Sequence, residues 1–194
     1  MRRRKVWTMA ALIGLSVCAL APIIPPGQID FYSSQQLGVV MELPKEAKSL
    51  ARGNMLTGKV GSLATMQKAG LPTQGVKAGA PAVFTFGGGT SWKLAIGTAK
   101  LAVFSPPGTV DFFSSGGSGL RFSLPEGVKP ALRKGYPGTV VDPKKLALCG
   151  LKDAQVGDIV ILTQTAKDKW RAQLLDVKHT AKLTFEDKKW EVVK

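Results

Sequence analysis

The decapeptide PPGQIDFYSS at residues 25–34 recurs 81 residues later as PPGTVDFFSS at residues 106–115. The alignment continues without a gap through Arg133, and 12 of its 28 positions are identical. Shorter matches follow in the same order and end with Ala-Lys-Leu at residues 99–101 and 181–183. A gap-free block followed by ordered matches indicates that this part of the chain arose by tandem duplication.

The length of the repeat bears on the domain organisation. Solenoid repeats usually run to roughly 20–50 residues, so a period of 81 is too long for that class of protein. Each copy is long enough to be a small domain with a modest core. We therefore predict two β modules at residues 25–105 and 106–186, preceded by an N-terminal segment at residues 1–24 and followed by a C-terminal tail at residues 187–194.

Short segments with apolar residues at every second position predict β-strands in both copies. Leu120, Phe122 and Leu124 alternate with polar residues, and residues 39–43 keep the same apolar face. Separate later strands are expected at residues 92–96 and 99–103 of the first copy and at 170–174 and 181–185 of the second, with both tryptophans, Trp92 and Trp170, in the core. The fold class is therefore mainly β: two tandem, duplicated β-barrels or β-sandwiches of about five or six strands each, or one composite barrel built from both copies.

One short helix is predicted in each module. Ser62 and Asp142 are suited to cap a helix N-terminus, and Pro143 suits the first helical position. Gly70 and Gly150 follow at the distance expected for helix ends. The same signals stand at matching positions of the two copies, which strengthens the prediction.

The first 24 residues have the pattern of a membrane-targeting segment. Four basic residues are followed by nineteen residues without a charge, which would span about 28 Å as a helix, close to the hydrocarbon thickness of a bilayer. We predict a signal-anchor, that is, a single-pass transmembrane helix, with its N-terminus in the cytoplasm and residues 25–194 in the periplasm of a bacterial inner membrane. The residues expected to place and fill this helix are Arg2, Arg3, Arg4, Lys5, Trp7, Leu12, Ile13, Leu15 and Leu20.

Two other interpretations of this segment stay open. Ala19-Leu20-Ala21 offers a small-x-small site for signal peptidase, although Pro22 follows it. Cys18 would be the lipidated residue of a bacterial lipoprotein, although Val17 stands where a small residue is expected. All three interpretations place residues 25–194 outside the cytoplasm.

The chain is basic, with 27 Lys and Arg against 13 Asp and Glu and a formal net charge of +14. Four positive charges belong to the N-terminal segment, so residues 25–194 carry 23 against 13. A basic surface favours anionic partners, among them anionic lipid headgroups. The lysines are scattered and the aromatic residues fit strand positions, so we expect no nucleic-acid partner.

The sequence contains few residues suited to catalysis or metal binding. His179 is the only histidine, and the two cysteines, Cys18 and Cys149, lie too far apart in the predicted organisation to suggest a disulfide framework or a metal site. We therefore predict no metal, no cofactor, no catalytic residue and no small-molecule substrate. An acid in the repeated motif, Asp30 or Asp111, is the remaining candidate if the chain were an enzyme.

Five residues are candidates for contact with a partner. Asp30 and Asp111 occupy the same place in the repeated motif, where an acid would bind a cationic group or bond to backbone amides of a turn. Near the C-terminus an aromatic residue between charged ones suggests an exposed contact. The candidates are Asp30, Asp111, Lys188, Lys189 and Trp190.

These features together predict a non-enzymatic, membrane-anchored extracytoplasmic protein. The leading hypothesis is an accessory or scaffold subunit of a larger membrane protein complex, such as a bioenergetic or secretion assembly, with the other subunits as partners. Two similar modules would allow it to bridge copies of a repeating partner. The alternative is a periplasmic binding module for an anionic envelope ligand: lipid, glycan or peptidoglycan.

Overall fold

A computed structural model describes residues 33–104, 119–128, 135–148, 150–166, 169–187 and 189–194. In these ranges the chain is mainly β, as predicted, and nine strands form one antiparallel sheet. The elements are η2 (Ser33–Leu37), β1 (Val39–Met41), β2 (Met55–Val60), α1 (Leu63–Lys68), β3 (Pro81–Gly88), β4 (Ser91–Phe104), β5 (Leu120–Phe122), β6 (Gly135–Val140), α2 (Pro143–Leu148), β7 (Ile159–Ala166), β8 (Lys169–Glu186) and β9 (Lys189–Val193).

The same order of elements occurs twice along the chain. A short strand, a second strand, a helix and two further strands form the series β1, β2, α1, β3, β4, and the series β5, β6, α2, β7, β8 repeats it. Corresponding elements begin 78 to 81 residues apart; β1 begins at residue 39 and β5 at 120, β4 at 91 and β8 at 169. β9 has no described counterpart in the first series.

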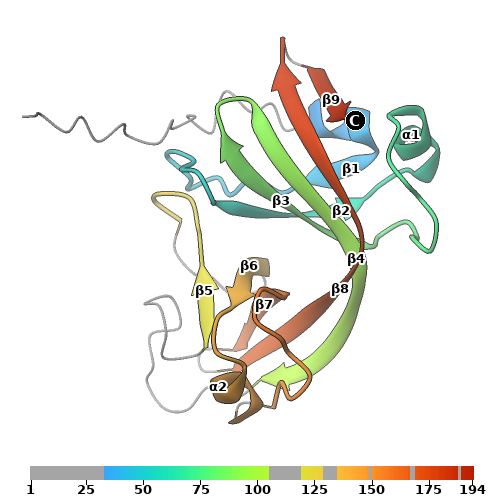
Figure 1. Cartoon of the computed structure of the whole chain (residues 1–194). Coiled ribbons are helices and arrows are strands. Elements are labelled where there is room, and N and C mark those ends of the chain that lie inside the picture. The colour runs from blue at the N-terminus through green and yellow to red at the C-terminus, as the bar shows by residue number, and fades with distance from the viewer. Residues whose placement is uncertain (1–32, 105–118, 129–134, 149, 167–168, 188) are drawn as a thin grey trace, which may run out of the picture.

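Two long strands, β4 and β8, join the halves of the sheet, whose order is β1-β2-β3-β4-β8-β7-β6-β5, with β9 on β8. Residues 91–96 of β4 pair with residues 179–184 of β8, and residues 97–104 pair with residues 170–177. The prediction of two separate strands in each of these segments is wrong, because the ladder between β4 and β8 continues across the expected breaks. Figure 1 shows both strands running from one half of the molecule into the other.

The sharing of β4 and β8 defines two lobes. The first lobe consists of β1–β3, the first half of β4, the second half of β8, and β9 (upper part of Figure 1). The second lobe consists of β5–β7, the first half of β8 and the second half of β4. Each lobe therefore contains strand residues from both copies of the sequence repeat.

Each lobe has its own hydrophobic core. The first is rich in aromatic residues, and Trp92 is buried in it, as predicted. Leu183 and Trp190 belong to this core although they lie near the C-terminus. The core of the second lobe is built around Leu120, Tyr136, Val140, Leu146, Val160, Leu162 and Ala172.

The lobes also contact one another directly. Met55, Val83 and Ala95 of the first lobe pack with Ile161 and Leu175 of the second in a small third cluster. These residues lie on the outward side of their strands, because their neighbours along each strand point into a lobe core.

A second contact between the lobes joins two loops. The Lys48 amide donates to the Glu126 carbonyl at 2.8 Å, and the Ser49 hydroxyl donates to the Glu126 carboxylate at the same distance. Nearby, the Asn54 side chain accepts from the Ala51 amide at 2.7 Å and donates to the Leu124 carbonyl at 3.1 Å. Asn54 is the one buried polar side chain of the described residues, and these bonds satisfy it.

The two helices begin and end as predicted. The Ser62 hydroxyl accepts from the Thr65 amide at 3.2 Å, and the Asp142 carboxylate accepts from the Lys144 amide at 3.1 Å. Gly70 follows α1 with φ +79°, a conformation that glycine adopts without strain.

The described ranges include no helix long and apolar enough to cross a membrane. The predicted anchor at residues 6–24, with the basic residues before it, lies outside the described residues.

Candidate interaction surface

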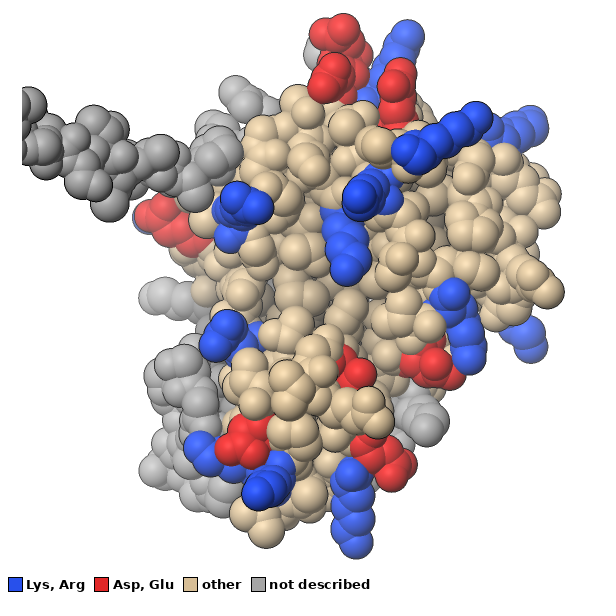
Figure 2. All heavy atoms as spheres, viewed as in Figure 1, with Lys and Arg blue, Asp and Glu red and all other residues tan. Residues whose placement is uncertain are grey.

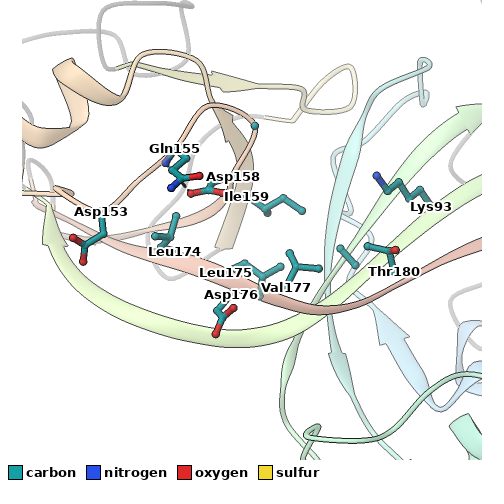
Figure 3. A pocket seen from close by; sticks show the side chains of 12 residues that line it. Lys93, Asp153, Gln155, Asp158, Ile159, Leu174, Leu175, Asp176, Val177 and Thr180 are labelled. Carbon is teal, nitrogen blue, oxygen red and sulfur yellow. Dashed lines mark hydrogen bonds between the residues drawn. The ribbon is translucent and has the colours of Figure 1, made fainter.

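A groove lies between the two lobes, on the outward side of the strands that form them (Figure 3). Its volume is about 550 Å³, and it is open to solvent. Apolar side chains from β4, β7 and β8 line it together with charged residues from the loop before β7. The lining residues include Ala95, Ile159, Leu174, Leu175, Val177, Asp153, Asp158, Asp176, Lys93 and Thr180.

Charges of opposite sign face one another across this groove. Figure 3 shows Asp153 and Asp158 on the side of the second lobe, and Lys93 and Thr180 on the side of the first. The Asp158 carboxylate accepts from the Gln155 amide at 2.8 Å, and Asp176 forms an ion pair with Lys178 at 2.7 Å. Asp158 and Asp176 therefore already have bonding partners within the chain, and their charges stabilise the local structure.

The described part of the chain shows no cluster of side chains that could hold a metal ion. No three His, Cys, Asp or Glu side chains of the described residues converge on a point that could hold a metal ion. His179 lies on β8, and its Nε2 atom is 2.6 Å from the Gln74 carbonyl oxygen, so this ring is bonded to backbone.

Exposed apolar side chains accompany the groove. Val177 lines it and is 38% exposed, and Val156, 71% exposed, stands between the lining residues Gln155 and Gly157. Val193 is 45% exposed on β9, beside a second hollow of about 600 Å³ that shares Lys93 and Thr180 with the groove. Single exposed apolar residues are ordinary, but three along one connected surface indicate a contact area.

The second hollow is basic. Lys93 of β4 and Lys182 of β8 are register partners, so their side chains leave the sheet side by side on its outward face. Both are exposed, and within the described residues neither has an ion-pair partner. Figure 2 shows Lys and Arg side chains on both lobes of the face in view.

The structure corrects one predicted contact residue. Trp190 is only 8% exposed and belongs to the first core, where its ring lies 4.9 Å from Phe185 and 5.7 Å from Trp92 between centroids. The expectation that it is an exposed aromatic contact is therefore wrong. Trp190 and Val192 alternate with Lys189 and Glu191, and this period of two was the signal for a strand with one buried face.

The other predicted contact residues are not brought together. Lys189 is exposed at the start of β9. Asp30, Asp111 and Lys188 lie outside the described residues, as do Cys149 and the residues of the predicted anchor.

Sequence reasoning missed the Lys93–Lys182 pair and the groove. Lys93 alternates with Trp92 and Leu94, which marks it as outward-facing. Its partner on β8 depends on a register between residues 89 positions apart, which no local pattern encodes.

Comparisons with known proteins give no family for this fold. No protein-family model matches the chain, and neither a curated protein nor a solved structure matches it significantly. The functional argument therefore depends on the groove and the surface around it.

Proposed function

We propose that this chain is a non-enzymatic, membrane-anchored scaffold subunit of a larger membrane protein complex. In this proposal residues 6–24 form a transmembrane helix in a bacterial inner membrane, and residues 25–194 are periplasmic. The folded part derives from two duplicated β modules whose long strands are shared.

One observation carries the proposal: the apolar side chains along the inter-lobe groove. Val177 lines a groove of about 550 Å³, and Val156 stands between two of its lining residues; Ile159 and Leu174 add further apolar side chains to a lining that also includes charged residues. Apolar surface that stays in water is unfavourable, so a partner that covers it gains affinity in proportion to the area buried. A groove whose lining mixes exposed apolar and charged side chains fits the core and rim of a protein interface.

Fractionation of cells tests both parts of this proposal. Full-length chain is expected in the membrane fraction with a stoichiometric protein partner, and a variant lacking residues 1–24 is expected in the soluble fraction. If the shortened chain still sediments with the same complex, the N-terminal segment is not its main attachment. If full-length chain is soluble and alone, the proposal is wrong.

The Lys93–Lys182 pair favours a second candidate, a periplasmic binding module for an anionic envelope ligand. Two adjacent ammonium groups with no described counter-ion are suited to an anion. Binding of this kind weakens as salt is added, because ions screen exposed charges. Sedimentation of the full-length chain with isolated envelope polymers at low and high salt distinguishes this candidate; binding that salt does not change would count against it.

A further inference from the structure

Lys93 and Lys182 lie in one row across the outward face of the first lobe. The strand register gives this row the order Thr85 of β3, Lys93 of β4, Lys182 of β8 and Val193 of β9. Each residue is the register partner of the next. Strand alternation brings Thr180 to the same face, one position from Lys182 in the outward series. The backbone of a four-strand ladder therefore fixes the spacing of these groups.

This arrangement is unfavourable when nothing is bound to it. Like charges directly opposite each other on antiparallel strands repel and destabilise the pair. Some other exposed lysines of the chain form ion pairs: Lys59 is 3.4 Å from Glu42, and Lys178 is 2.7 Å from Asp176. Neither Lys93 nor Lys182 forms such an ion pair with a described residue, so a bound anion would replace repulsion with attraction.

Hydroxyl groups supply the hydrogen bonds that an oxyanion needs. The Thr85 and Thr180 hydroxyls make no hydrogen bond to another described residue, so they are available as donors. The hollow of about 600 Å³ is lined by Lys93, Thr180 and Lys182 and has room for a headgroup, and Thr85 stands next to Lys93 on the neighbouring strand β3. A phosphate monoester offers three terminal acceptor oxygens to such a set of donors, and a diester offers two terminal oxygens in a tetrahedral arrangement that differs from the planar one of a carboxylate.

An acidic residue at the rim limits the site. Glu191 of β9 is the register partner of Thr184, so it stands on the same face, diagonal to Lys182. It forms no ion pair with a described residue. Its charge opposes a bound anion, which makes Glu191→Gln a variant expected to bind more tightly.

We infer that Lys93 and Lys182, with Thr85 and Thr180, form a phosphate-binding site on the outer face of the first lobe. The ligand class is a phosphate ester, either the diester headgroup of an anionic lipid or a soluble phosphate. This inference rests on the second candidate function, in which the chain binds an anionic ligand. It does not depend on a protein partner in the groove.

Calorimetric titration of the full-length chain in a neutral detergent tests the site. The three probes are inorganic phosphate, glycerol 3-phosphate and glycerophosphoglycerol, which carries the diester headgroup without acyl chains. The variant K93Q/K182Q is compared with K68Q/K144Q, which removes two charges from exposed lysines on α1 and α2. Unfolding temperatures of both variants check that they are folded.

We expect K93Q/K182Q to bind the best probe about tenfold or more weakly, since two charge-assisted contacts are lost, and K68Q/K144Q to bind within about twofold of wild type. Tightest binding of glycerophosphoglycerol would identify a lipid headgroup, and tightest binding of either monophosphate would identify a soluble source. Removing the repulsion should leave K93Q/K182Q at least as stable as wild type without ligand.

Three results would overturn the inference. They are no binding of any probe, full binding by K93Q/K182Q, or an equal loss in K68Q/K144Q, which would indicate attraction to net charge alone. A chain that co-purifies with a membrane complex but binds none of the probes would refute the site and leave the scaffold proposal standing.

Discussion

Gly97 of β4 lies so close to Asp176 of β8 that a Cβ atom on Gly97 would overlap the Asp176 carbonyl oxygen. The contact occurs at the bulge where the register shifts, with Ile96 opposite His179 and Gly97 opposite Val177. Both shared strands pass from one lobe to the other at this point. A single glycine therefore permits the crossing on which the two-lobed fold depends.

The substitution Gly97→Ala is expected to destabilise the protein by about 1–3 kcal/mol or more, because backbone rather than a flexible side chain must move. Gly61→Ala is the matched control, since the nearest atom to its Cβ would be a Val40 methyl at 3.4 Å, an ordinary contact. Urea unfolding in detergent measures the free energy of unfolding of both variants, Gly97→Ala and Gly61→Ala. Equal losses at the two positions would contradict the close approach.

Asn54 joins the lobes through a buried amide, so its removal should loosen the loop contact. Asn54→Ala leaves the Ala51 amide and the Leu124 carbonyl without their partner and should cost about 1–3 kcal/mol. Asn54→Asp should cost more, because a carboxylate would face the Ser123 and Leu124 carbonyl oxygens. The free energy of unfolding of the two variants tests whether Asn54→Asp is the less stable. An Asn54→Asp protein as stable as wild type would refute this prediction.

Trp190 stabilises the first lobe, and we expect Trp190→Ala to cost about 3–5 kcal/mol of unfolding free energy. Val193→Ala on the same strand changes an outward side chain that is 45% exposed, so its effect should stay within about 0.5 kcal/mol. Denaturant titration compares the two. A Trp190→Ala protein of normal stability that lost a partner would restore the contact role that the structure argues against.

The apolar residues beside the inter-lobe groove should matter for partner binding and not for stability. Val156→Asp and Val177→Asp each place a charge where the proposed partner excludes water, which should weaken co-purification at least about tenfold. Ala78→Asp adds the same charge at an exposed position of the first lobe, away from the groove. Quantitative pull-down and thermal unfolding measure both effects, and retention of the partner by both valine variants would refute this surface.

Local sequence patterns predicted much of the secondary structure. Alternation identified the strands around Leu120 and Trp92, and the cap residues Ser62 and Asp142 identified both helices. These features depend on neighbours within a few positions, which is why a single sequence contains them.

The sharing of strands and the surface sites were not predictable in the same way. Whether β4 continues past Ile96 depends on its pairing with β8, and the Lys93–Lys182 row depends on that same register. The burial of Trp190 depends on β9 folding back onto β8. Each of these requires a contact between distant segments, which periodicity within one segment does not specify.

Gentle detergent extraction of native membranes tests the central proposal most directly. The extract is separated by size, and mass spectrometry identifies what co-migrates with the chain and whether its N-terminal peptide is present. We predict co-migration with a larger complex at constant stoichiometry and an intact segment at residues 1–24. A monomer of about the mass of the chain alone, 20.6 kDa or less, that lacks this segment would contradict the proposal of a membrane-anchored scaffold subunit.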